Sequence, residues 1–335
     1  MTNAINVTND LLLIYNTNSA DSATVMNYYL AHRPNVGGAN VLGIGCPTNE
    51  IISSVDFSNQ VLAPYANWLT NNPAKRPQYV ILFLDMPSRV IDIGIHTWPS
   101  VQYMLATNIP GYKPFVTSIN MNGTNDCIAY IDKIASLGTL ISSNSPLLSA
   151  SAGGYGNTNW YFDDTRYYYN SPAPSVGSNA LSGVLRVNST ASVTYSNAVD
   201  SGLVSHITSG YNVAGYMSWG FHSSLGSIYA TNGNVQWSGN SGWWIIETVE
   251  SFNGQRAGDG GNFLMWFSSC AFGGTNYSNT PIGAISSPDE PGAFGVCDTG
   301  KFFGLWASGK NFGICAWSLL TTDEFQAVGD PFITK

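Results

Sequence analysis

The sequence has few charged residues. Asp, Glu, Lys and Arg make up 10% of its 335 residues, whereas they make up about a quarter of a typical soluble domain. Apolar residues account for 44% of the chain and aromatic residues for 13%, and the polar remainder is mainly Asn, Ser, Thr, Gly and Tyr. A surface built from uncharged amides and hydroxyls favours an extracellular or cell-envelope location, which we therefore expect.

Basic residues are too few and too scattered to bind a polyanion. The 12 Lys and Arg residues are outnumbered by 20 Asp and Glu, which gives a net charge of −8. Nucleic acid is not an expected partner, because a phosphate backbone needs a basic stripe. No apolar run approaches the roughly 20 residues that a membrane helix needs. The start "MTNAINVTNDLLLIYN" has no signal-peptide pattern, so we expect a secreted form to have lost its leader.

Several short motifs of catalysis and cofactor binding are also missing. No G-x-G-x-x-G follows the first apolar run, which argues against a nucleotide cofactor, and no G-x-S-x-G elbow of serine hydrolases is present. The five cysteines form no C-x-x-C pair, so a thiolate metal site is not expected. Asp259 in "AGDGGN" resembles half of a calcium loop without its other oxygen ligands. We expect neither a cofactor nor a metal ion.

Apolar runs alternate with amphipathic stretches along residues 1–141. The run "PQYVILFLDMP" is apolar at successive positions, as in strands covered by helices on both faces. The stretch "TNDCIAYIDKIASLG" begins with capping residues and ends at a glycine, as expected of a helix. The pattern predicts a doubly wound α/β fold, with helices flanking a mostly parallel sheet. Strands are predicted over 10–16, 39–46, 77–87 and 113–121, and helices over 19–33, 58–72 and 124–138.

The second half of the chain is predicted to continue the same sheet after an interruption. Residues 142–195 are rich in Gly, Ser, Pro, Asn and Tyr, which predicts a long irregular insertion such as a lid. Residues 196–335 resume the alternation, so we interpret 1–335 as a single α/β domain. In this half, helices are predicted over 196–210 and 243–254, and strands over 211–220 and 262–270.

His222 and Cys270 each follow one of these predicted strands. Parallel strands joined by a right-handed crossover end at the same edge of the sheet, where catalytic groups of α/β proteins gather. A histidine within hydrogen-bonding distance of a thiol favours the reactive thiolate. Gly273 and Gly274 would let backbone N–H groups approach an oxyanion. An ordinary interpretation stays open too, with His222 bonded to a loop carbonyl and Cys270 a buried thiol.

This layout, a strand and a histidine before a neighbouring strand and a cysteine, resembles the caspase, gingipain and legumain group of cysteine peptidases. The closing "FQAVGDPFITK" is similar to the Gly-Asp-Pro that ends many gingipain-type catalytic domains. The resemblance implies a caspase-like fold and a peptide or protein substrate attacked by Cys270. Nearly the whole chain also resembles a family of bacterial proteins of unknown function, through "YYLAHRPNVGGANVLGIGCPTNEIIS", "YVILFLDMPSRV", "GAISSPDEPG" and "AVGDP".

Two acidic pairs are further candidates for substrate binding. Asp289 and Glu290 follow the predicted strand "PIGAIS", where they could bind substrate or cap a helix. Asp163 and Asp164 could bind a cation, or form a loop salt bridge with Arg166.

Two functions remain open at this point. One is a secreted cysteine-peptidase-like hydrolase that uses a His222/Cys270 dyad. The other is a non-catalytic surface, binding or self-assembling protein on the same fold. Aromatic clusters at 160–162, 167–169 and 243–244 fit the second function, because aromatic side chains supply interface area at low entropic cost, unless they pack in the core.

Overall fold

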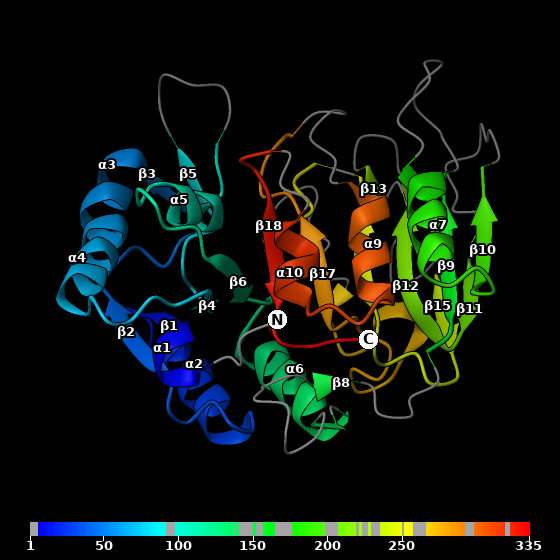
Figure 1. The fold of residues 1–335 in the computed structure, drawn as a ribbon, viewed down its shortest axis with the longest axis horizontal. Coiled ribbons are helices and arrows are strands. Elements are labelled where there is room, and N and C mark those ends of the chain that lie inside the picture. Colours follow the sequence, from blue (N-terminus) through cyan, green and yellow to red (C-terminus); the bar gives the residue numbers. More distant parts are fainter. Residues whose placement is uncertain are drawn as a thin grey trace.

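Ten strands form one central sheet in the computed structural model (Figure 1). The structure describes residues 6–91, 98–137, 139–140, 150–151, 157–164, 176–197, 207–218, 221–222, 227–228, 235–249, 251–256, 266–291, 298–318 and 322–335. In spatial order the strands are β10 (Ser192–Ser196), β9 (Asn159–Asp163), β12 (Val213–Ser218), β16 (Ile245–Thr248), β17 (Gly283–Ser286), β18 (Gln326–Gly329), β6 (Phe115–Ile119), β4 (Tyr79–Phe83), β1 (Leu11–Asn16) and β2 (Asn40–Ile44).

The sheet is mostly parallel, as predicted. The strands from β10 to β17 are parallel to their neighbours, and so are those from β6 to β2. β18 runs antiparallel to β17 and meets β6 at one register pair, Val328 opposite Ser118. The two halves of the chain therefore share one sheet, with β18 between them.

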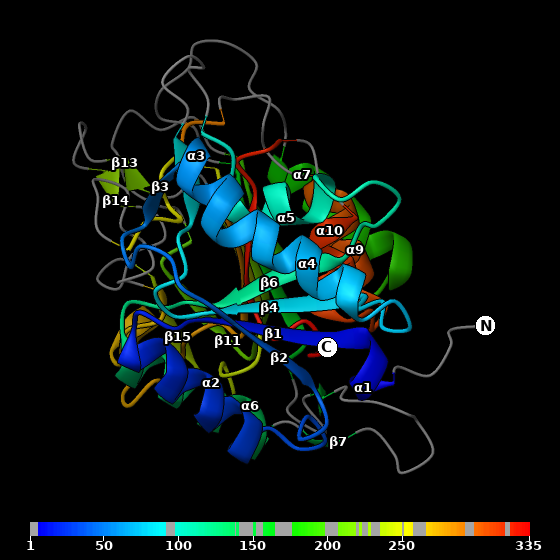
Figure 2. The ribbon, with the colours of Figure 1, turned by 90° about the vertical axis from the view of Figure 1, so that its left-hand side faces the viewer.

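Helices cover both faces of the sheet in its N-terminal part (Figure 2). α2 (Ala20–His32) and α6 (Thr124–Leu137) lie on one face, and α4 (Ala63–Asn71) and α5 (Val101–Thr107) lie on the other. Leu11 and Leu13 belong to the core on the α2 side, whereas Leu12 and Ile14 belong to the core on the α4 side. The alternation explains why the strands read as unbroken apolar runs.

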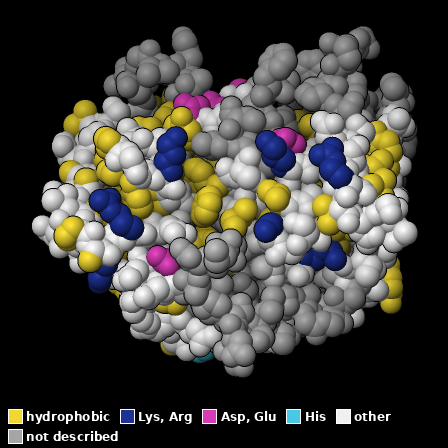
Figure 3. Space-filling model, viewed as in Figure 1, with side chains coloured by type: hydrophobic (Ala, Val, Ile, Leu, Met, Phe, Trp, Pro, Cys, Tyr) yellow, Lys and Arg dark blue, Asp and Glu magenta, His cyan; other side chains and the backbone are white. Residues whose placement is uncertain are grey.

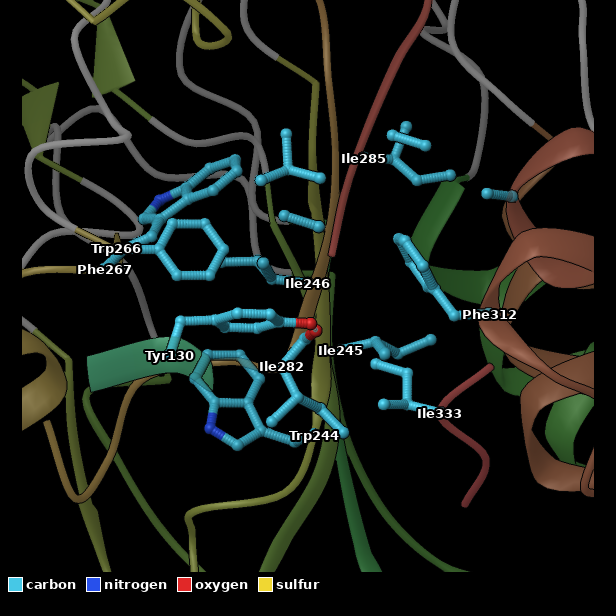
Figure 4. Close-up of a cluster of buried hydrophobic side chains, with 14 of the residues drawn as sticks. Tyr130, Trp244, Ile245, Ile246, Trp266, Phe267, Ile282, Ile285, Phe312 and Ile333 are labelled. Atoms are coloured by element: carbon cyan, nitrogen blue, oxygen red, sulfur yellow. Dashed lines mark hydrogen bonds between the residues drawn. The ribbon is translucent and has the colours of Figure 1, made fainter. Parts of the chain in front are cut away.

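In the described residues, the C-terminal part of the sheet is covered by helices on one face and by turns, together with α6, on the other. α7 (Val176–Val187), α9 (Thr299–Ala307) and α10 (Phe312–Trp317) lie on the α4 side (Figure 1). On the opposite face, Trp237, Trp244 and Phe272 form a buried aromatic cluster. Figure 4 shows the core between these layers, where Tyr130 of α6 donates a hydrogen bond to the carbonyl of Ile282 at 2.7 Å.

The remaining described elements are short. The small two-stranded sheets pair β3 (Ile51–Ser53) with β5 (Arg89–Ile91), β7 (Thr139–Leu140) with β8 (Ala150–Ser151), β11 (Ser209–Tyr211) with β15 (Gln236–Ser238), and β13 (Phe221–His222) with β14 (Ser227–Ile228). The short helices are α1 (Val7–Asp10), α3 (Ser54–Asp56), the π-helix η1 (Phe57–Leu62) and the 3₁₀ turn η3 (Ala271–Gly273).

Three predictions for the second half were wrong. Residues 142–195 are not an irregular insertion where they are described, since they supply β9, α7 and β10 to the main fold. The stretch 243–254, predicted as a helix, contains strand β16. Residues 266–270, predicted as the end of a strand, form a turn that leads into η3. α7 has a helical period of its own, with Val176, Ala180 and Gly183 buried on one face, but the Gly, Ser and Pro content of the segment obscured it. In the other two cases burial by tertiary packing, rather than local periodicity, sets the conformation.

Candidate site at the carboxyl edge of the sheet

The carboxyl edge is the edge where the parallel strands end, and loops from both halves of the chain meet there. Arg256, in the loop after β16, donates from Nη1 to Oδ1 of Asp85 at 2.7 Å. The backbone N–H of Arg256 donates to Oε1 of Glu50 at 2.6 Å. Ser19, the N-cap of α2, donates from Oγ to the other oxygen of Asp85 at 2.6 Å. These bonds fix the loop after β16 against the N-terminal half.

A second arginine, Arg89, lies beside the turn that follows β17. Its Nη1 donates to the carbonyl oxygen of Pro288 at 2.8 Å and lies 3.9 Å from Oδ1 of Asp289. The guanidinium also stands 5.0 Å from the ring centroid of Trp98, a cation–π distance. The backbone N–H of Trp98 donates to Oδ2 of Asp289 at 3.1 Å. Burial raises the pKa of Asp289, and the charge of Arg89 opposes this shift.

Glu290 lies next to Asp289 at the same edge, in agreement with the predicted strand before them. Its side chain is exposed, and its Oε1 accepts a hydrogen bond from Oγ of Ser251 at 2.5 Å. Ser251 belongs to the loop after β16, so the loops after two neighbouring strands are joined here. Both acids predicted after β17 thus lie at the carboxyl edge, Asp289 buried and Glu290 exposed, and substrate binding by them stays a prediction.

Glu324, just before β18, adds a third carboxyl group that sequence reasoning missed. The residue is only 2% exposed. Its Oε2 accepts from Oγ1 of Thr322 at 3.1 Å, while its Oε1 is buried without a hydrogen-bond partner in the described structure. Burial raises its pKa to about 7, and nearby carboxylates, among them Asp289 and Glu290, add to the rise. An acid directly before a short apolar strand, in "DEFQAVG", was the available sequence signal.

Cys270 does not follow a strand of the sheet. It is exposed and stands at the start of η3, in the turns that cover the α6 side of β16 and β17. The following Phe272 stacks on Trp237 and contacts Trp244, and Tyr277 N–H donates to the carbonyl of Ser269. The strand that was expected to carry this thiol to the carboxyl edge is therefore absent from residues 266–270.

The two glycines after Cys270 belong to the same turn. Gly273 has a φ of 70°, a left-handed conformation that favours glycine. The N–H of Gly274 already donates to the carbonyl of Ala271 at 3.0 Å. A β-carbon on Gly274 would lie 2.8 Å from both the backbone nitrogen of Asn279 and Oγ of Ser278. Close packing within the turn thus explains the glycine at 274 without an oxyanion.

His222 lies beyond the carboxyl end of β12, as predicted. The backbone of Phe221–His222 forms β13, but the imidazole lies outside the described residues. The strand next to β12 in the sheet is β16, and the residues that follow it are Val249, Glu250 and Ser251. The structure therefore does not bring the histidine strand and Cys270 together at neighbouring strand ends.

Asp163 ends β9, Asp164 follows it, and both carboxylates bond to the protein itself. The carboxylate of Asp164 accepts from the backbone N–H groups of Gly177 and Ser178 at 2.7 and 2.8 Å, which caps α7. Oδ2 of Asp163 accepts from the N–H of Ile207 at 3.3 Å. Arg166 lies outside the described residues. Helix capping accounts for Asp164, whereas substrate binding by this pair stays a prediction.

The aromatic clusters at 160–162 and 243–244 are core residues. Each of their side chains is at most 7% exposed, so these clusters offer no interface, and that part of the prediction was wrong; residues 167–169 lie outside the described chain. Cys46, Cys127 and Cys315 are buried, and burial raises their pKa values, to about 12 for Cys46 and Cys127.

Neither a metal cluster nor a membrane helix is found within the described ranges. No group of three or more His, Cys, Asp or Glu side chains there is arranged to hold a metal ion. No helix of that part combines the length and the apolar character needed to cross a bilayer. Asp259, the half calcium loop, lies outside these ranges.

The fold is similar to that of cysteine proteinases of known structure. The chain superposes on gingipain R, described as an Arg specific cysteine proteinase, with a TM-score of 0.59 and 12% identity, covering 100% of this chain and 80% of that one. The complex of the Porphyromonas gingivalis RgpB pro- and mature domains gives a TM-score of 0.57 at 10% identity, with 96% of this chain and 79% of that chain covered. A third structure, described as a protease, gives a TM-score of 0.54 at 10% identity, with 99% of this chain and 79% of that chain covered. No protein-family model and no curated protein matches the chain.

Proposed function

We propose that this chain is a binding protein on a cysteine-peptidase-like fold, which recognises a cationic group of a peptide or protein at the carboxyl edge. The observation that carries the proposal is the sequence after β16, Val249-Glu250-Ser251, which has no cysteine. The exposed thiol of Cys270 instead belongs to the turn around η3. In this proposal Cys270 is not a nucleophile.

The acids of the carboxyl edge support a cationic ligand. Asp289, Glu290 and Glu324 lie near one another, and the buried Oε1 of Glu324 has no hydrogen-bond partner in the described chain. A guanidinium or ammonium group would satisfy this oxygen and favour the ionised carboxylate. Arg89 already neutralises part of the charge of Asp289, which leaves Glu324 as the principal acceptor in this proposal.

A calorimetric titration tests the ligand. Peptides that contain arginine should bind more tightly than the same peptides with citrulline, which is similar in shape but uncharged. Binding should strengthen between about pH 6 and about pH 8, because the ligand favours the ionised form of a carboxyl group whose pKa is about 7. Binding should also release protons, which titrations in buffers of different ionisation enthalpy measure. This proton release should disappear in the Glu324→Gln variant.

The matched control is Asp298→Asn, which removes an exposed carboxylate outside the proposed binding set. It should leave the affinity and the proton release unchanged. Equal affinity for the arginine and citrulline peptides, or proton release that persists in Glu324→Gln, would contradict the proposed ligand.

Thiol labelling tests the absence of cysteine catalysis. With iodoacetamide, Cys270 should react as an ordinary exposed thiol, and His222→Ala should not change its rate. The buried Cys46, Cys127 and Cys315 should stay unlabelled in the native protein. Fast labelling of Cys270 below pH 7 that slows in His222→Ala would instead favour the cysteine-peptidase-like hydrolase.

The weakly charged composition supports an extracellular or cell-envelope setting for this binding function. Fractionation of the native cells, with the chain followed by an antibody, tests this part separately. Recovery of the protein in the cytoplasm would contradict it.

A further inference from the structure

The exposed cations of the described chain gather on one side of the sheet. Figure 3 views this side, which is formed by α4, α5, α7, α9 and α10, and shows Lys and Arg spread across it with few Asp and Glu. Within the described residues, Lys301 alone of these exposed cations has a carboxylate within 4.0 Å. Acids outnumber bases by 20 to 12 in the chain, so the separation is not a result of composition. These cations are Arg76, Lys113, Arg186, Lys301 and Lys310.

Half-buried apolar side chains belong to helices on the same side of the sheet. Trp68 of α4, Met104 of α5 and Trp317 of α10 are half-buried and pack at the border of the core beneath them. In Figure 3 the hydrophobic colour reaches the surface over these helices. An apolar centre with a polar rim is the usual anatomy of a protein interface. We call this surface, with its five exposed cations, the basic face.

The opposite side of the sheet carries the complementary charge. On α2 and α6, Asp21 and Asp132 are exposed and Asp126 is half-buried. The lysine of α6, Lys133, is buried, and so is Arg33, which follows α2. The exposed surface of these two helices, which we call the acidic face, therefore has no Lys or Arg.

We propose that copies of this chain associate head to tail, with the basic face of one copy on the acidic face of the next. The two faces lie on opposite sides of the sheet (Figure 2). A twofold pairing of like faces would oppose like charges, so charge complementarity favours a heterologous contact, which builds rings or filaments. A polyanion would match the basic face alone, whereas a second copy matches both faces. The carboxyl edge takes no part in this contact.

Sedimentation velocity at rising protein concentration tests the association. The chain should associate at about 20 mM salt and dissociate at about 0.5 M salt, because salt screens charges across such an interface. Arg76→Glu with Lys113→Glu should raise the apparent dissociation constant at least about tenfold. Thr48→Glu with Asn49→Asp, two exposed residues near the carboxyl edge, adds acid away from both faces and should have little effect.

A charge exchange between copies tests the pairing of the two faces. Lys113→Glu chains and Asp132→Lys chains should each associate weakly alone, and their mixture should recover association. Thermal unfolding of each variant controls for misfolding. A chain that stays monomeric at low salt and high concentration would overturn the proposal. A mixture of the two variants that does not recover association would also overturn it. Binding of heparin or anionic vesicles to the basic face by a chain that stays monomeric would overturn it as well.

Discussion

The two halves of the sheet are built by different means. In the N-terminal half, strands alternate with helices along the chain, and helices cover both faces. In the described residues of the C-terminal half, α7, α9 and α10 cover one side, and turns that contain Trp237, Trp244 and Phe272 pack beside α6 on the other. A layer of turns buries aromatic residues at no fixed period. Sequence periodicity therefore predicts the first half well and the second half poorly.

The strand β16 illustrates the difference. Trp243 to Ile246 are four apolar residues followed by Glu247, a short run that periodicity alone does not assign to a strand or a helix. In the structure all four strand residues, Glu247 included, are buried. Burial raises the pKa of Glu247 well above its usual value, which favours the uncharged form of the side chain. From the sequence alone, a buried acid such as Glu247 is interpreted as a solvent-exposed one.

The largest loss of stability is expected when the ion pair that joins the two halves is broken. Arg33, after α2, donates from Nε to Oδ2 of Asp330 at 2.7 Å, and Tyr29 donates to the same oxygen at 3.0 Å. Asp330→Asn should lower the free energy of unfolding by about 3–5 kcal/mol, because Arg33 would stay buried without its counter-charge. Urea unfolding measures the loss.

The exposed pair Lys301–Asp298 is the control for this change. Asp298→Asn should alter the free energy of unfolding by less than about 1 kcal/mol. If the two variants cost the same, the buried pair does not join the halves as described.

A smaller loss is expected where two helices of the C-terminal half touch. A β-carbon on Gly183 of α7 would lie 2.0 Å from the carbonyl oxygen of Gly300 in α9. Gly183→Ala should cost about 1–3 kcal/mol through overpacking, despite the better helix propensity of alanine. Ser182→Ala, at an exposed position of the same helix, should be neutral or slightly stabilising. A neutral Gly183→Ala would mean a looser contact between the helices.

A pH dependence should distinguish the turn layer from the helical layers. Lys133 of α6 donates from Nζ to the carbonyls of Tyr277 and Thr280, at 2.9 and 2.6 Å. Burial lowers its pKa to about 7, so between about pH 7 and pH 10 the unfolded chain holds a proton that the folded chain has released. Stability should therefore rise with pH in this window, by at most about 1.4 kcal/mol per pH unit.

Unfolding by urea between about pH 7 and pH 9 measures this slope. Lys133→Met should remove this contribution to it, whereas substitution of an exposed lysine such as Lys113→Met should preserve it. An identical slope in the native chain and in Lys133→Met would show that the amine stays protonated.

The smallest change in stability is expected for a substitution of Cys270. Its side chain is exposed in a turn, so Cys270→Ala should change the free energy of unfolding by less than about 0.5 kcal/mol. Cys127→Ser, which places a hydroxyl in the core between α6 and the sheet, should cost more. Equal losses would mean that the turn at η3 packs its thiol as tightly as the core does.

The sequence by itself determined the α/β class, the strands β1, β2, β4 and β6, and the presence of Asp289 and Glu290 after a strand. Each follows from a local pattern: apolar runs, capping residues, and the strand before the acids. Only the tertiary structure decided that β16 is a strand, that Cys270 belongs to a turn, and that Glu324 lies near Asp289. These features depend on which segments become neighbours, and contacts between distant residues leave no period in the sequence.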